Sequence, residues 1–161
     1  MQHLTAHVPL HFSRTTDRSV HGDLLQRLGV WRHVCDSYYL AIDETHGAGL
    51  GRLLDQWLEQ LERLRVLGRP VFLPFDFSDR CAAWLHVSNR DGSRVVEEAG
   101  WSMIEGWSFH PSDIAETASR IDDFAPIHNT DIECDLDDLV ASVSRRRAEL
   151  GTARSTADGA A

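Results

Sequence analysis

The residues with the greatest capacity for chemistry lie between 100 and 113, where aromatic and acidic side chains are close together in the chain. The triplet Gly-Trp-Ser occurs twice here, six residues apart, so Trp101 and Trp107 would share one face of an extended chain. Aromatic walls with a few polar groups form both small-molecule pockets and protein-binding surfaces, although large aromatics more often serve packing in a core. We predict ligand- or partner-binding roles for five residues, which are Trp84, Trp101, Trp107, Asp79 and Asp113.

Candidates for general acid–base catalysis occur in the same region, namely Asp76, Glu105 and His110. Carboxylates and imidazoles are the side chains that most often move protons near neutral pH. The sequence contains no H-E-x-x-H, G-x-S-x-G or strand-associated G-x-G-x-x-G motif. Asp79 and Asp113 also suit structural roles, as a turn residue and as the cap of a helix. The sequence therefore leaves open whether the protein is an enzyme.

Metal and cofactor chemistry have little support in the sequence. All 16 basic residues are arginine, so a Schiff base and the lysine of a phosphate-binding loop are both excluded. The exclusive use of arginine indicates a GC-rich bacterial genome. The histidines at positions 3, 7 and 11 would share the exposed face of a strand and are interpreted as solvated. We predict no metal site and no cofactor, and three reduced thiols at Cys35, Cys81 and Cys134.

The negative charge of the chain is concentrated in one segment. Residues 97–138 contain 12 acidic residues and a single basic one, Arg120, within a chain whose net charge is −9. An acidic segment repels phosphate backbones, which disfavours nucleic acid as a partner, and it attracts basic proteins. The alternative is an ordinary solvated surface that keeps the protein soluble.

Hydrophobic periodicity predicts an α+β fold, with a mostly antiparallel sheet of about 5–6 strands packed against 3–4 helices. Strands are predicted over 5–14, 30–42, 71–77 and 124–127, and a hairpin over 83–87 and 95–103 that turns at Asp91-Gly92. Helices are predicted over 22–28, 50–67 and 112–121 and from 135 onward. The length suits a single domain over 1–150. The small polar residues of 151–161 predict a disordered C-terminal tail.

Together these observations favour a small acidic cytosolic protein-binding module, which binds a basic protein through an acidic face and exposed aromatic residues. Bacterial immunity proteins against nuclease toxins, and antitoxins, have this general character. The alternative is a small enzyme or ligand-binding accessory protein of a biosynthetic pathway, with a small molecule in an aromatic and carboxylate pocket. No segment resembles a membrane span or a secretory signal, so we expect a cytoplasmic location and no membrane partner. Oligomeric state and the identity of the partner are not indicated.

Overall fold

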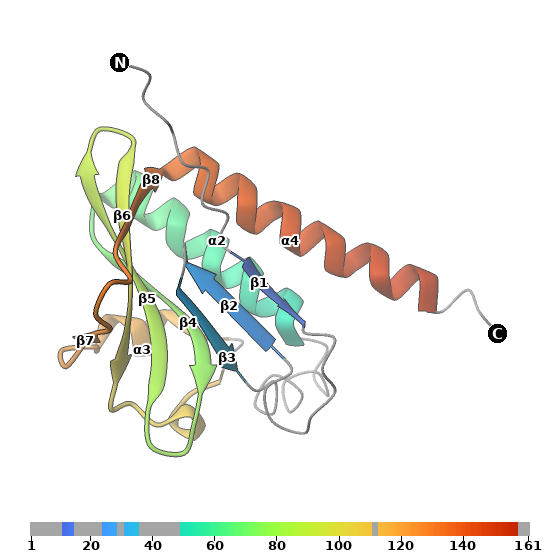
Figure 1. The fold of residues 1–161 in the computed structure, drawn as a ribbon, viewed down its shortest axis with the longest axis horizontal. Helices are drawn as coiled ribbons and strands as arrows, with labels where there is room; N and C mark the ends of the chain where they lie inside the picture. Colours follow the sequence, from blue (N-terminus) through green and yellow to red (C-terminus); the bar gives the residue numbers. More distant parts are fainter. Residues whose placement is uncertain (1–10, 15–23, 29–30, 36–48, 111–112, 158–161) are drawn as a thin grey trace.

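The computed structural model describes residues 11–14, 24–28, 31–35, 49–110 and 113–157. It shows an α+β fold in which all pairings between the described strands are antiparallel (Figure 1). The predicted fold class is therefore confirmed. Among the described residues, no helix combines the length and the apolar character needed to cross a membrane.

The larger sheet has five strands. The strands β4 (Val71–Phe77), β5 (Ala82–Asp91) and β6 (Arg94–Ser102) follow one another as a meander. The short strands β7 (Ala125–Pro126) and β8 (Ile132–Asp135) both pair with β6, at opposite ends of it. The β5–β6 hairpin turns at Gly92, whose φ of +53° is readily adopted by glycine. The predicted hairpin is confirmed.

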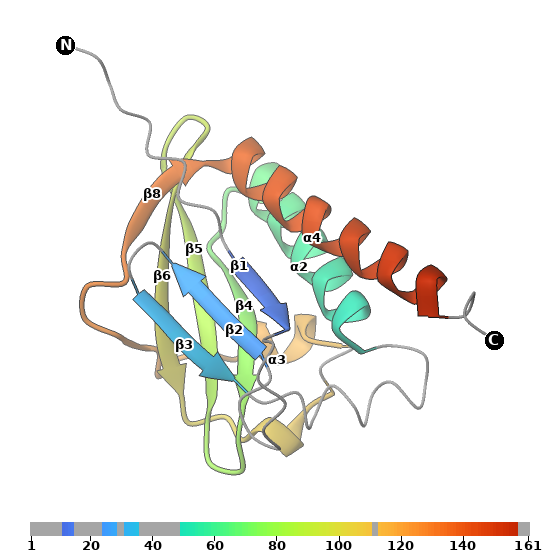
Figure 2. The same cartoon turned by 45° about the vertical axis from the view of Figure 1, so that its right-hand side comes forward.

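A second sheet of three strands lies beside β4 on the same face of the larger sheet as α2 (Gly49–Leu67) (Figure 2). Its strands are β1 (His11–Arg14), β2 (Leu24–Leu28) and β3 (Trp31–Cys35), in that order. Leu28 and Cys35 belong to the same buried cluster as the leucines of α2 and the inward residues of β4 and β5. The small sheet and α2 together therefore cover one face of the larger sheet.

The helix α2 packs through one apolar stripe, and α4 (Leu136–Ala157) lies beside it (Figure 1). The stripe forms because the buried leucines, with Trp57, recur at helical spacing, as the sequence predicts. From α4, Leu136, Leu139 and Val143 complete the same cluster. Arg147 Nε donates to Asp55 Oδ1 at 2.8 Å. This bond joins the two helices, although its two residues are 92 positions apart in the sequence.

The other face of the larger sheet is covered by α3 (Ala115–Ser119) and its neighbours. Here Ala82, Trp84 and Ala118 form a second, smaller buried cluster, with Phe109 and Phe124 packed against it. At 5 residues, α3 is shorter than the predicted helix, and its N-cap is Ile114 with no side-chain cap. The interpretation of Asp113 as the helix cap is therefore wrong.

A β-bulge in β4 is held in place by a hydrogen bond from Trp57 of α2. The register between β4 and β5 shifts between Pro74 and Asp76, and the fully buried indole of Trp57 donates to the carbonyl oxygen of Pro74 at 2.9 Å. Proline is tolerated here because β4 ends the strand order of its sheet, so one of its edges is not needed for ladder bonds. The bulge turns the carboxylate of Asp76 toward the small sheet, where it meets His33.

Two further expectations are overturned. Residues 24–28 form the strand β2 rather than part of a helix, because they pair along both edges with β1 and β3. The last helix continues through Ala157, so residues 151–157 are helical and not a disordered tail. The predicted strand residues 5–10 and 36–42, with His3 and His7, lie outside the described residues.

The bond between Trp57 and Pro74 generates a prediction about stability. Trp57→Phe keeps most of the ring but leaves a buried carbonyl without its donor, so we expect a loss of about 1–3 kcal/mol in the free energy of unfolding. Urea denaturation followed by circular dichroism measures it. Trp107→Phe is the matched control, because Trp107 makes the same type of bond, to the Asp79 carbonyl at 3.2 Å, but at the exposed surface. The idea fails if the two variants lose equal stability.

Candidate functional site

The three tryptophans predicted to bind a ligand or partner lie in three different surroundings. Trp84 is fully buried on the α3 side of the sheet and stacks on Phe109. Trp101 is half-buried on the opposite face, beside His33 of the small sheet. Trp107 is 63% exposed in the short 3₁₀ turn η1 (Gly106–Ser108). The expectation that Trp101 and Trp107 share a face is wrong. The strand β6 ends at Ser102, so the alternation of side chains along a strand does not extend to Trp107.

Apolar and acidic residues lie in the segments that follow β6 and α3 and in the β4–β5 turn, and hydrogen bonds join these segments to one another. Met103 is 71% exposed and Trp107 63%. The Met103 backbone N–H contacts the carboxylate of Asp123, and Trp107 contacts the backbone of Asp79. We call this the Trp107 surface, which consists of Asp79, Met103, Glu105, Trp107, Asp122 and Asp123. It unites the predicted residues Asp79, Glu105 and Trp107 with Met103, Asp122 and Asp123, which the sequence analysis did not single out.

Asp123 holds this surface in shape. Its carboxylate accepts hydrogen bonds from Ser102 Oγ at 2.7 Å and from the Met103 backbone N–H at 2.8 Å. These two bonds lower the pKa of Asp123, so the carboxylate is ionised at neutral pH. The segment after β6 is thereby tied to the connection that follows α3.

A close backbone approach positions Trp107. The N–H of Gly106 donates to the carbonyl oxygen of Ser78 at 2.7 Å, which brings η1 against the β4–β5 turn. A Cβ at Gly106 would lie only 2.9 Å from Phe77 Cβ and from Ser78 O, so a larger residue does not fit without a shift. Trp107 Nε1 then reaches the Asp79 carbonyl at 3.2 Å. The predicted role of Asp79 as a turn residue between strands is confirmed.

The remaining acids of 97–138 do not extend this surface. At the opposite end of β6, Glu133 pairs with Arg94 at 3.2 Å and Asp137 with Arg65 at 2.6 Å. Asp135 there accepts a hydrogen bond from Ser93 Oγ at 2.7 Å. Acids of this segment therefore lie at both ends of β6, and Glu133, Asp135 and Asp137 at the β8 end each have a local partner.

The catalytic candidates are not brought together. Asp76 lies between the two sheets, with Oδ2 at 2.7 Å from His33 Nε2, whereas Glu105 belongs to the Trp107 surface and His110 is exposed. Asp113 is also exposed. The partner of Asp76, His33, was missed by the sequence analysis. The available signal was the alternation of Trp31, His33 and Cys35, which places all three on the inward face of β3.

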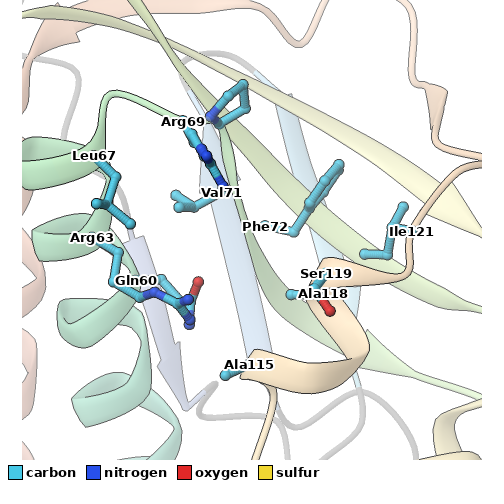
Figure 3. A pocket seen from close by; sticks show the side chains of 11 residues that line it. Gln60, Arg63, Leu67, Arg69, Val71, Phe72, Ala115, Ala118, Ser119 and Ile121 are labelled. Carbon is cyan, nitrogen blue, oxygen red and sulfur yellow. The ribbon is translucent and has the colours of Figure 1, made fainter.

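A cavity of about 270 Å³ opens between the C-terminal end of α2, the start of β4 and α3 (Figure 3). Arg63 and Gln60 from α2 face Ala115 and Ser119 from α3 across it, and Phe72 forms part of its wall (Figure 3). None of the predicted site residues lines this cavity. Its basic and apolar lining also differs from the aromatic and carboxylate pocket that the sequence predicts.

Glu97 is a buried acid in the sheet itself. Its side chain points into the core between Val95 and Ala99, and the residue is only 2% exposed. Burial raises the pKa of Glu97 to about 7, although the hydrogen bond that Cys134 Sγ donates to Oε2 at 3.4 Å acts in the opposite direction. Among the described residues, Oε1 of Glu97 has no hydrogen-bond partner. The same burial and the nearby carboxylate raise the pKa of the Cys134 thiol.

Glu97 makes stability dependent on pH. Its pKa of about 7 in the folded chain exceeds the ordinary value near 4.3, so the folded state binds the extra proton between these values. The contribution of Glu97 to stability is therefore greatest below about pH 4 and is lost as the pH rises through about 7. Glu97→Gln removes the charge, and above pH 7 we expect it to raise the free energy of unfolding by up to about 3 kcal/mol.

Urea unfolding at about pH 5 and pH 8 measures this effect. The gain of Glu97→Gln over the wild type should grow between the two pH values. Glu98→Gln is the control, since Glu98 is the next residue of β6 and points to the opposite face. An equal gain at both pH values would show that Glu97 does not titrate in this range.

Comparisons with known proteins bear on the fold. No protein-family model matches the sequence, and no curated protein matches it. Among solved structures, the chain is similar to one chain of the "CdiA-CT/CdiI toxin and immunity complex from Enterobacter cloacae". That similarity has a TM-score of 0.53 at 13% sequence identity, and it covers 84% of this chain and 97% of the other. The two chains therefore share their fold over most of their length.

Proposed function

We propose that the protein is an immunity-like binding module that engages a basic partner protein through the Trp107 surface. The observation that carries this proposal is the exposure of Trp107 and Met103 in segments joined to those of Asp79 and Asp123, which are also exposed. Large apolar side chains are costly to leave in water, and an exposed tryptophan with an acidic border has the composition of an interface hot spot.

The carboxylates of Asp122 and Asp123 are available to a partner. Within the described part of the chain, no arginine forms an ion pair with Asp122 or Asp123, in contrast to Glu133 and Asp137 at the other end of β6. Carboxylates that form no ion pair within the chain attract a basic protein and accelerate its association. The hydrogen bonds of Asp123 and the close approach at Gly106 reduce the conformational cost of binding, because the surface is already ordered.

The fold adds support of a general kind. The similar solved chain comes from a complex of a toxin with an immunity protein, so this fold occurs in an assembly of two proteins. Immunity-like activity in the cytoplasm against a basic toxin is the specific form of protein binding that we propose. The alternative, a small-molecule pocket, stays a prediction, and the separation of Trp84, Trp101 and Trp107 gives it no added support.

The experiment is a tagged pull-down from a lysate of the source organism at low and high salt, followed by binding measurements with the purified partner. We expect a basic protein that is retained at low salt and lost at high salt. Trp107→Ala should weaken its binding at least about tenfold, with most of the change in the dissociation rate. Val66→Ala is the matched control, because Val66 is a 71% exposed apolar residue on α2, away from this surface.

Charge reversal separates local from overall electrostatics. Asp122→Arg and Asp138→Arg change the net charge equally, but Asp122 belongs to the Trp107 surface and Asp138 lies in the first turn of α4. We expect Asp122→Arg to slow association markedly and Asp138→Arg to have a much smaller effect. Equal changes in the association rate for Asp122→Arg and Asp138→Arg would indicate only a nonspecific electrostatic attraction. Wild-type binding by both Trp107→Ala and Asp122→Arg would rule out this surface.

A further inference from the structure

Three side chains with metal-binding atoms meet where the small sheet packs on the larger one. They are His33 and Cys35 from β3 and Asp76 from β4, and one ligand atom of each lies within 4.8 Å of those of the other two. His33 Nε2 and Asp76 Oδ2 are 2.7 Å apart. No other group of three such residues is found in the part of the chain that the structure describes.

Strand alternation in β3 and the bulge in β4 bring these ligand atoms close together. His33 and Cys35 are two residues apart on β3, so both project from its inward face. Asp76 reaches the same point because the bulge after Pro74 places it opposite Ala83, a residue of the main core. On an unshifted strand, Asp76 would lie on the same face as Pro74 and Phe72. The register shift and the strand alternation are separate features of the fold, and both lead to this site.

The surroundings favour a bound cation. Cys35 is buried, and the side chains of His33 and Asp76 are 28% and 15% exposed. Trp31 stacks on His33 at 5.8 Å, and Trp101 meets its ring edge-on at 5.6 Å. These aromatic neighbours limit the access of water to the site, which strengthens the attraction between a cation and its anionic ligands.

We propose that His33, Cys35 and Asp76 bind a divalent transition metal ion of the zinc class. Imidazole, thiolate and carboxylate are the three ligand types of zinc, whereas calcium and magnesium prefer oxygen ligands alone. Ligand atoms around tetrahedral zinc lie roughly 3.3–3.8 Å apart, given bonds of about 2.0–2.3 Å. Because the ligand atoms already lie within 4.8 Å of one another, small side-chain rotations suffice, with His33 and Asp76 moving slightly apart. Cys35 binds as the thiolate, and its proton passes to the solvent.

The site joins the two sheets, since β3 supplies two ligands and β4 the third. Three protein ligands leave a fourth position for water or an external group, as in metal sites that remain open. The bound ion would hold the small sheet on the larger one and raise the stability of the whole chain. The site shares no residue with the Trp107 surface, so the proposal of a metal site is independent of the proposed function.

Cobalt(II) is the probe, because a thiolate ligand gives a charge-transfer band and a tetrahedral site gives strong visible bands. The full-length protein, first stripped of metal with a chelator, is titrated with Co²⁺ and then with Zn²⁺. We expect one Co²⁺ per chain with a charge-transfer band that Zn²⁺ removes, and a higher melting temperature with Zn²⁺ than without it.

Variants test two of the three ligands, and the variant of Cys35 has matched controls. Cys35→Ser should abolish the charge-transfer band, while Cys81→Ser and Cys134→Ser should retain it. Cys134 is a stringent control because its thiol also lies beside a carboxylate, that of Glu97 at 3.4 Å. Asp76→Asn, which keeps the shape of the side chain, should lower the Co²⁺ affinity at least about tenfold. Circular dichroism of each metal-free variant establishes that it is folded.

Two results would overturn the proposal. Binding of Co²⁺ without a charge-transfer band would indicate histidines elsewhere in the chain. A band that persists in Cys35→Ser and disappears in Cys134→Ser would place the metal at Glu97 instead. Should Cys35→Ser fail to fold, Asp76→Asn decides the matter alone, and unchanged affinity in that variant would exclude the site.

Discussion

The hydrogen bond from Trp57 to the carbonyl oxygen of Pro74 is the contact on which the rest of the structure depends. It attaches the middle of α2 to β4 at the residue where the strand register shifts. The helix stripe packs on the sheet around this point, and the shifted strand turns Asp76 toward the small sheet. One buried bond therefore couples helix packing to the docking of β3, because displacement of the indole would alter both.

Elements with a strong and long-continued periodicity were predictable from the sequence. The leucine stripe of α2 belongs to this group, whereas the Asp-Gly turn between β5 and β6 was predictable from its residue types. The strand β2 was not, because five residues are too few to distinguish a helical from an alternating pattern. Its conformation is decided by pairing with β1 and β3, which is a tertiary effect.

The sites were less predictable than the elements, for two physical reasons. His33 and Asp76 are 43 residues apart, and a bulge decides the direction of Asp76, so no local pattern indicates their contact. The number of acidic residues follows directly from the sequence, but the sequence did not indicate where they lie on the folded surface. Arg94 and Arg65 pair with acids at the β8 end of β6, whereas Asp122 and Asp123, at the other end, form no ion pair in the described part of the chain. A charge count along the chain does not distinguish these two ends.

The strand order of the larger sheet also affects the speed and order of folding. The strands β4, β5 and β6 pair with their neighbours in the chain, so their contacts close short loops and cost little entropy. By contrast, β8 joins the start of β6 only after the 3₁₀ turn, α3 and β7 have intervened. We infer that the meander is the natural nucleus, and that β8 and α4 dock late. Changes within the β5–β6 hairpin would then slow folding, whereas changes in α4 would mainly speed unfolding.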